Sequence, residues 1–308
     1  MSAVIETSKL SKWYGNVLGL SDVTLSIEPG ILGLLGPNGA GKSTFFKLLT
    51  GQLKPSIGTV TVFGEPVRNH HRVFSRIGLC PEQDALYEEL SGWDFLANLL
   101  RLNGYGRAEI ASRAERALAT VELLDDKDRI VRGYSRGMRQ RLKFAQAIAH
   151  DPEVVILDEP LSGLDPLGKR KLIRLIKDFG RQGRTVLVSS HVLPEIEALT
   201  SNIVLIHQGK ILAWGDIHYI RDLIDAHPHI IAVRSTAARA LAAHFVGEPY
   251  VHKVQFENSG DLVLFETTNR ERFFDRLTRY AADAAAGVEE ITSPDDNLQA
   301  VFDYLVGT

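Results

Sequence analysis

The stretch Gly36-Pro37-Asn38-Gly39-Ala40-Gly41-Lys42-Ser43 decides the fold of this chain. It fits the pattern G-x-x-x-x-G-K-[ST], whose glycines let backbone N–H groups converge on phosphate groups. The apolar residues 31–35 before it predict a strand, and residues 45–49 after it predict a helix. Because the N-terminus of a helix carries partial positive charge, it favours a bound phosphate. The stretch therefore predicts an α/β domain that binds a nucleotide.

Two side chains of this stretch have predicted roles of their own. Lys42 is expected to reach the β- and γ-phosphates of ATP, and the Ser43 hydroxyl to take a coordination position on Mg²⁺. The candidate nucleotide-binding residues of the loop are Gly36, Pro37, Asn38, Gly39, Ala40, Gly41, Lys42, Ser43 and Thr44.

A pair of acidic residues, Asp158-Glu159, follows the apolar run 154–157, which predicts a strand buried on both faces. In α/β sheets, ligands bind at the carboxyl ends of the strands. We therefore expect Asp158 to hold Mg²⁺, directly or through water, and Glu159 to polarise the attacking water. Such a pair alone is more often solvated, but beside the phosphate-binding loop it indicates catalysis.

Alternating strand and helix patterns predict an α/β domain with a parallel sheet over residues 1–222. Helical periodicity dominates residues 90–150, which predicts a helical insertion with Ser91 as an N-cap.

A second, ferredoxin-like α+β domain is predicted over residues 229–308, because its elements follow the order βαββαβ. The predicted strands are 229–233, 251–256, 261–267 and 288–292, and the predicted helices are 237–245, 270–286 and the closing 297–305. For this domain we prefer a packing or dimerisation module to a regulatory sensor.

Composition and charge exclude several classes of protein. The net charge of −3 provides no basic field, so no nucleic-acid partner is expected. The single cysteine, Cys80, excludes an internal disulfide and fits a reducing compartment, and we expect its side chain to be buried. No apolar run approaches the about 20 residues that span a bilayer, and the first residues lack a signal-peptide pattern. We therefore expect a cytoplasmic chain that reaches a membrane through a partner.

Four further segments appear in order along the first domain: Lys12-Trp13-Tyr14-Gly15, Tyr134-Ser135-Arg136-Gly137-Met138, Leu161-Ser162-Gly163-Leu164-Asp165 and Ser189-Ser190-His191. Together with the phosphate-binding loop and Asp158-Glu159, they resemble the ATP-binding cassette (ABC) family across the whole first domain. The C-terminal residues resemble one exporter branch of that family more loosely.

The resemblance implies a role for each segment. Tyr14 lies where the family stacks an aromatic ring on adenine, and His191 lies where the family senses the γ-phosphate. Ser135 and Gly137 are expected to meet a phosphate bound by the opposite subunit, and Asp165 belongs to a loop that crosses the dimer interface. Taken alone, Tyr14 would indicate surface packing and His191 a core or helix-start histidine.

The sequence departs from the common family pattern at Arg136 and Met138, where the family usually has Gly and Gln. Similar variants occur in the branch that exports drugs, polysaccharides and lipids. Farther along the same helix, Arg141 and Lys143 are expected on a solvated face.

A second departure concerns the loop that couples Mg²⁺ to the membrane partner. Gln83 resembles the glutamine of that loop, but the spacing to Ala85-Leu86-Tyr87 favours Glu82 at the position. A carboxylate would bind Mg²⁺ more strongly than an amide. We therefore assign Glu82 to the metal and to coupling, with Gln83 as the alternative.

The function implied by the resemblance is ATP hydrolysis that powers transport through a separately encoded integral-membrane permease. The chain is expected to dimerise on ATP-Mg²⁺ with a second copy or a related ATPase subunit. It would lie on the inner face of the cell membrane through its permease. The alternative is a mechanical or regulatory ATPase that drives a membrane complex without moving a substrate.

Overall fold

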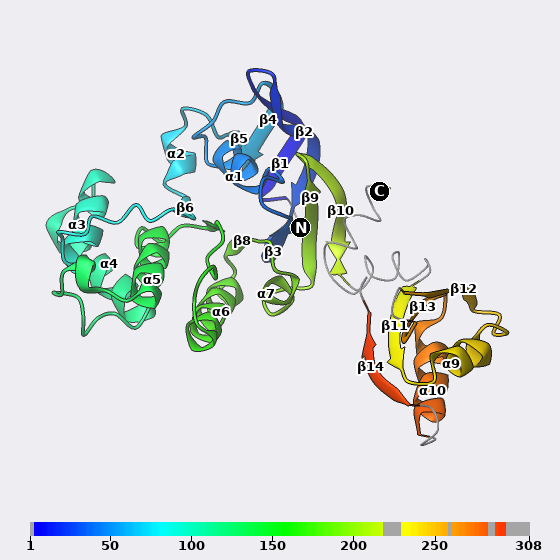
Figure 1. The fold of residues 1–308 in the computed structure, drawn as a ribbon. Coiled ribbons are helices and arrows are strands. Elements are labelled where there is room, and N and C mark those ends of the chain that lie inside the picture. The colour runs from blue at the N-terminus through cyan, green and yellow to red at the C-terminus, as the bar shows by residue number, and fades with distance from the viewer. Residues whose placement is uncertain (1–2, 218–228, 258–259, 283–286, 294–308) are drawn as a thin grey trace. The chain divides into compact units, whose positions relative to one another are not determined.

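The computed structural model describes residues 3–217, 229–257, 260–282 and 287–293, and Figure 1 traces the chain. The chain divides after Ile217 into two compact units. The predicted limit of the first domain at residue 222 lies outside the described residues, while the first strand of the second unit starts at His229.

A six-stranded sheet forms the centre of the first unit, in the order β10-β9-β3-β8-β7-β6. Its strands are β3 (Ile31–Leu35), β6 (Ile77–Cys80), β7 (Val154–Leu157), β8 (Thr185–Ser190), β9 (Asn202–His207) and β10 (Lys210–Asp216). Neighbouring strands from β9 to β6 are parallel, and β10 adds an antiparallel edge. Every residue of β7 and β8 is buried, as the continuous apolar runs predict.

A smaller antiparallel sheet has the order β2-β1-β4-β5. Its strands are β1 (Ile5–Tyr14), β2 (Val17–Ile27), β4 (Ile57–Val62) and β5 (Glu65–Pro66), and the short helix α2 (His71–Phe74) follows. Side chains of both sheets and of α1 (Lys42–Leu49) share one hydrophobic core that includes Leu10, Phe45 and Ile156. The predicted class, a parallel sheet with an antiparallel portion near the N-terminus, is confirmed.

A group of helices follows β6, drawn cyan to green in Figure 1. It contains α3 (Gly92–Leu102), α4 (Arg107–Thr120), the 3₁₀ turn Val131–Gly133 and α5 (Arg136–Ile148). Ser91 caps α3 as predicted, because its hydroxyl accepts the N–H of Asp94 at 3.0 Å. Two more helices, α6 (Pro166–Arg181) and α7 (Leu193–Glu197), flank β8 in the sequence.

The second unit has one antiparallel sheet with the order β12-β13-β11-β14. Its elements are β11 (His229–Ser235), α9 (Ala238–Phe245), β12 (Val251–Phe256), β13 (Leu262–Thr267), α10 (Arg270–Ala281) and β14 (Val288–Thr292). This order and pairing are the ferredoxin-like topology that the sequence predicts. Residues 283–286 of the predicted helix 270–286, and the predicted closing helix 297–305, lie outside the described residues.

Candidate nucleotide-binding and catalytic site

The parallel strands bring the candidate residues to one edge of the central sheet. Leu35, the last residue of β3, pairs with Ser190, the last residue of β8. The phosphate-binding loop therefore begins beside His191, which follows β8. Asp158-Glu159 follows β7, which is the neighbour of β8 on the other side. Parallel pairing thus gathers segments from distant parts of the sequence at the edge where ligands bind.

The phosphate-binding loop needs glycine at two positions because a side chain would collide with backbone. A Cβ at Gly36 would lie 2.3 Å from the carbonyl oxygen of Ile206, and one at Gly41 would lie 2.8 Å from that of Gly19. Gly41 also has a φ of 109°, which residues with a Cβ rarely adopt. It is the N-cap of α1, so the tight loop opens onto a helix N-terminus and fits a phosphate group.

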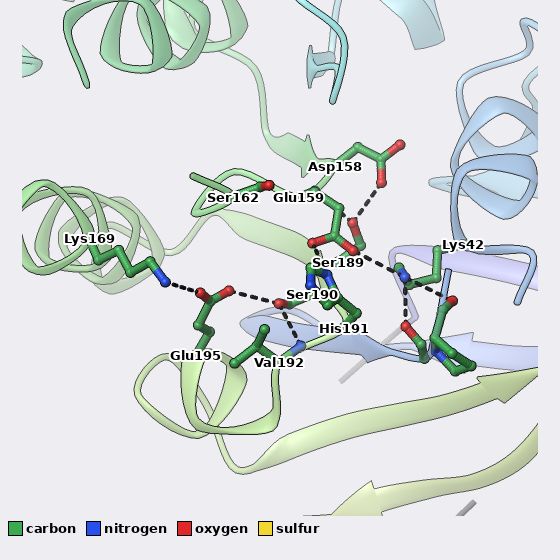
Figure 2. Close-up of polar contacts among 12 residues, drawn as sticks. Lys42, Asp158, Glu159, Ser162, Lys169, Ser189, Ser190, His191, Val192 and Glu195 are labelled. Atoms are coloured by element: carbon green, nitrogen blue, oxygen red, sulfur yellow. Dashed lines mark hydrogen bonds and ion pairs between the residues drawn. The ribbon is translucent and has the colours of Figure 1, made fainter. Parts of the chain in front are cut away.

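Lys42 lies at the base of this loop with 6% of its surface exposed. Its Nζ donates to the carbonyl oxygens of Gly36 at 2.6 Å and Pro37 at 3.2 Å. It also pairs with Oε1 of Glu159 at 3.1 Å (Figure 2). A buried ammonium group requires such partners, since isolated charges are costly to bury. Phosphate oxygens are acceptors of the same kind, so Lys42 fits the predicted contact.

Asp158 and Glu159 are both buried, and Ser189 of β8 holds the two residues in place. The Ser189 hydroxyl donates to Oδ1 of Asp158 at 2.6 Å and accepts the backbone N–H of Glu159 at 2.8 Å. Glu159 has a φ of 47°, a left-handed conformation that is uncommon outside glycine. The chain turns sharply there, and the two carboxylates leave β7 in different directions (Figure 2).

The Glu159 carboxylate contacts two predicted site residues at once. Its Oε2 lies 3.0 Å from Nδ1 of His191, while Oε1 faces Lys42. The ion pair with Lys42 lacks hydrogen-bond alignment, so Oε1 is a buried oxygen that accepts no hydrogen bond. An acceptor in that state is suited to bind a water molecule. The His191 side chain is 42% exposed and so lies at the rim of the site.

A cavity of about 430 Å³ opens above the phosphate-binding loop. Tyr14 lines this cavity and is 45% exposed, and its hydroxyl is 3.3 Å from the Thr44 hydroxyl. An exposed ring beside a phosphate cradle is a surface on which a base could stack. Residues of the whole loop from Pro37 to Thr44 and Glu159 line the same cavity.

Glu82 lines this cavity together with the phosphate-binding loop, whereas Gln83 lines a neighbouring cavity of about 640 Å³, to which Glu82 also contributes. Both residues are exposed in the loop that follows β6. The metal-site assignment of Glu82 stays a prediction, and the placement of the two side chains is the observation that favours it.

The expectation that Lys143 lies on a solvated helix face is wrong. Lys143 of α5 is 1% exposed, and its Nζ donates to the backbone oxygen of Glu82 at 2.8 Å and to Oδ1 of Asp84 at 3.2 Å. The long side chain reaches inward to the loop after β6, because that loop offers oxygens that compensate its charge. Beneath the same loop, burial raises the pKa of the Cys80 thiol to about 12.

Arg141, predicted on the same solvated face, is instead partly buried, with 18% of its side chain exposed. Its guanidinium donates to the carbonyl oxygens of Val121 and Glu122 at 2.8 Å.

The residues assigned to a second subunit lie outside the cavity above the loop. Ser135 is the N-cap of α5 and accepts the N–H of Met138 at 3.2 Å, and Gly137 lies in the first turn of that helix. Asp165 is the N-cap of α6 and accepts the N–H of Gly168 at 3.2 Å. Arg136 donates to the carbonyl oxygen of Ser162 at 3.4 Å, so its charge is held against the segment 161–165 of its own chain.

The residues present fit Mg²⁺ bound together with a nucleotide. Ser43 and Asp158 supply a hydroxyl and a carboxylate near the phosphate-binding loop, and Glu82 offers a further carboxylate. Proteins usually hold Mg²⁺ on nucleotides with one or two side-chain oxygens, and phosphates and water complete the octahedron. Within the described part of the chain, no three His, Cys, Asp or Glu side chains group to hold a metal by themselves.

The geometry defines the class of protein: an ATPase domain of the phosphate-binding-loop type, with an acidic pair and a histidine at the edge of a parallel sheet. Comparisons with known proteins narrow this class. The family model for the ABC transporter matches residues 20–162. The bacitracin transport ATP-binding protein BcrA of Enterococcus faecalis is 39% identical over 100% of this chain and 97% of its own length. The Nod factor export ATP-binding protein I of Cupriavidus metallidurans is 34% identical over 72% of this chain and 74% of its own length.

A solved structure of an ATP-binding subunit of an ABC transporter agrees in fold, with a TM-score of 0.65 and 29% identity over 72% of this chain and 93% of that one. The chain belongs to the ATP-binding proteins of the ABC transporter family. It is therefore an ATPase, with ATP as its substrate and Mg²⁺ as its cofactor. Among the described helices, none has the length and apolar character needed to cross a bilayer.

Proposed function

We propose that this chain hydrolyses ATP between two copies of itself, or with a related subunit, and thereby powers export through a separate membrane permease. The observation that carries the proposal is the Glu159 carboxylate, which meets Lys42 through one oxygen and His191 through the other. Export and permease association are supported by the full-length similarity to a bacitracin transport subunit and by the similarity to a Nod factor export subunit.

The contacts suggest what each side chain does during hydrolysis. Lys42 leaves its pair with Glu159 to bind the β- and γ-phosphates of ATP, since these carry more negative charge. Glu159 is then free to accept a proton from the attacking water. His191 holds the other carboxylate oxygen and contacts the γ-phosphate from the rim. Mg²⁺, when bound by Ser43 and Asp158, neutralises charge that develops on the phosphate oxygens.

A second copy would complete the site with its Ser135 and Gly137. The N-terminus of α5, capped by Ser135, presents backbone N–H groups of the kind that bind phosphate oxygens. The alternation between a closed ATP-bound dimer and an open state would drive the permease, because ATP favours the closed state. On this basis the chain works at the inner face of the cell membrane, attached through its permease.

The test uses Glu159→Gln, which keeps the side chain's shape but removes the proton acceptor. We expect ATP turnover to fall at least about 100-fold, with ATP binding retained. Size-exclusion chromatography in ATP-Mg²⁺ should then show a stable dimer. A monomeric variant with unchanged turnover would refute the assigned role of Glu159.

The second unit is proposed to act as a packing or dimerisation module. Its core is a cluster of aromatic and aliphatic side chains around Phe245, Phe265 and Phe273. This packing supports a unit that folds around its own core.

A further inference from the structure

A second buried carboxylate, that of Glu195 in α7, lies close to the catalytic residues in Figure 2. Its surface is 8% exposed. Its Oε1 accepts a charge-assisted hydrogen bond from Nζ of Lys169 at 2.7 Å, and its Oε2 accepts one from the hydroxyl of Ser190 at 2.8 Å. Each carboxylate oxygen therefore binds a different element of the fold, and the position of Glu195 depends on both.

Ser190 connects this carboxylate to the backbone that carries His191. The Ser190 hydroxyl donates to Glu195 and accepts the N–H of Val192 at 3.0 Å. These contacts bracket His191 and hold the bend by which the chain leaves β8. Because the Ser190 hydroxyl donates its proton to Glu195, the lone pairs of the Ser190 oxygen remain available to accept the N–H of Val192. Glu195 thus fixes the bend that presents His191 to Glu159.

Lys169 connects the same carboxylate to a different part of the site. Lys169 lies in the first turns of α6, and its backbone N–H donates to the carbonyl oxygen of Asp165 at 2.9 Å. Asp165 is the N-cap of that helix and the last residue of the segment 161–165. A displacement of this segment would therefore move Lys169 with it.

We propose that Glu195 is a positioning residue that couples the segment 161–165 to His191 through Lys169 and Ser190. This inference rests on the proposed function, because the segment meets a second subunit only in the proposed dimer. The buried carboxylate must stay paired, since an uncompensated charge in the interior is strongly unfavourable. It therefore follows Lys169 when α6 moves, and Ser190 transmits that shift to the bend at His191. Closure of the dimer thereby sets the His191–Glu159 contact within the same chain.

The experiment compares Glu195→Gln, Lys169→Met and the double variant with a matched control, Lys171→Met. Lys171 lies on the same helix, but its Nζ pairs with Oε2 of Glu122 at 2.8 Å, away from His191. We expect kcat to fall about tenfold in Glu195→Gln and about fivefold in Lys169→Met, while the Kd for an ATP analogue changes less than about twofold. The control should keep both values.

The double variant tests whether the two residues act through one connection. If they do, its kcat should be no lower than that of Glu195→Gln, because the second change removes nothing further. A fall of about fiftyfold, the product of the two single effects, would overturn the coupling.

A second measurement separates positioning from simple loss of stability. The His191 signal in a histidine-detected NMR spectrum, assigned with His191→Gln, should shift in Glu195→Gln and in Lys169→Met but not in Lys171→Met. An unmoved signal with wild-type kcat would overturn the inference. If the wild-type chain failed to hydrolyse ATP, the proposed function would fail instead; if it hydrolyses and Glu195→Gln matches it, the coupling alone is wrong.

Discussion

The two units of the chain bury different kinds of side chain. Within residues 3–217, the first unit buries five charged residues: Lys42, Lys143, Asp158, Glu159 and Glu195. In the second unit, the buried polar residues within the described ranges are Ser235 and Thr267, and the core is a cluster of rings around Phe245, Phe265 and Phe273. Buried charge is therefore concentrated where nucleotide chemistry is expected.

This difference shows what each unit is built to do. Buried ion pairs add little net stability because desolvation offsets most of their attraction, so they indicate a requirement other than folding. In the first unit, these ion pairs fix the orientation of the side chains at the edge of the sheet. The second unit gains its stability from apolar contacts, which have no comparable directional role.

The largest predicted effect concerns the ring cluster of the second unit. Phe273 is fully buried and lies 4.6 Å from Phe245 and 5.1 Å from Phe265 between ring centroids. Phe273→Ala should lower the unfolding free energy of this unit by about 3–5 kcal/mol. Hydrogen exchange should show faster exchange in β11 and β13, while ATP affinity stays unchanged. The control, Phe274→Ala, removes a partly buried ring and should have a smaller effect. Loss of ATP binding with Phe273→Ala would contradict the separation of the two units.

The next prediction concerns buried charge in the first unit. Lys42→Ala removes a charge-assisted contact to the β- and γ-phosphates, worth about 1.5–3 kcal/mol. The Kd for a labelled ATP analogue should therefore rise about 10- to 100-fold. Lys47→Ala on the exposed side of the same helix serves as the control. Equal affinities for the two variants would mean that the loop is not a phosphate cradle.

Much of the fold could be predicted because its signals are local. The continuous apolar run Val154–Leu157 predicts a buried strand from four adjacent residues, and the structure has a strand with these bounds. The ferredoxin-like order of the second unit follows from the alternation of apolar residues and turns over short ranges. Local patterns of this kind depend on neighbours in the sequence, so they need no knowledge of tertiary contacts.

The pairing of buried charges could not be predicted because the partners lie far apart in the sequence. Lys143 lies 61 residues from Glu82, whose backbone oxygen accepts its hydrogen bond, and Lys169 lies 26 residues from Glu195, whose carboxylate pairs with it. In the sequence, Lys143 follows Arg139 and Arg141 on a helix rich in basic residues, a pattern that favours a solvated face. Only the packing of α5 beside the loop after β6 shows that one of these cations is buried.

A smaller effect is expected at the loop that Lys143 holds. Glu82→Ala should raise the Mg²⁺ concentration at half-maximal ATPase activity about fivefold, an effect on the order of 1 kcal/mol for an exposed carboxylate. Gln83→Ala is the matched control, because it is the adjacent exposed residue and lines a different cavity. The reverse ranking of the two variants would show that the register of this loop is shifted by one residue.

The last prediction is a pH dependence of the stability of the first unit, which extends the comparison to a half-buried titratable group, His150. His150 follows α5, and its Nε2 lies 3.0 Å from the backbone oxygen of Ile77, so this nitrogen donates the hydrogen bond. Burial lowers the pKa of His150, and Arg113 acts in the same direction, whereas the Ile77 oxygen and Asp151 oppose the shift.

The sign of the pH effect follows from this lowered pKa. An unfolded histidine takes up a proton near pH 6.5, whereas the folded His150 resists protonation, so the unfolded state binds more protons below that pH. The unfolding free energy should therefore fall as the pH is lowered from about 6.5, by at most about 1.4 kcal/mol per pH unit for a single proton. His150→Gln keeps a donor for the Ile77 oxygen but cannot titrate. Urea denaturation between pH 7 and 5 should give a smaller slope for this variant, and equal slopes would show that another group sets the pH dependence.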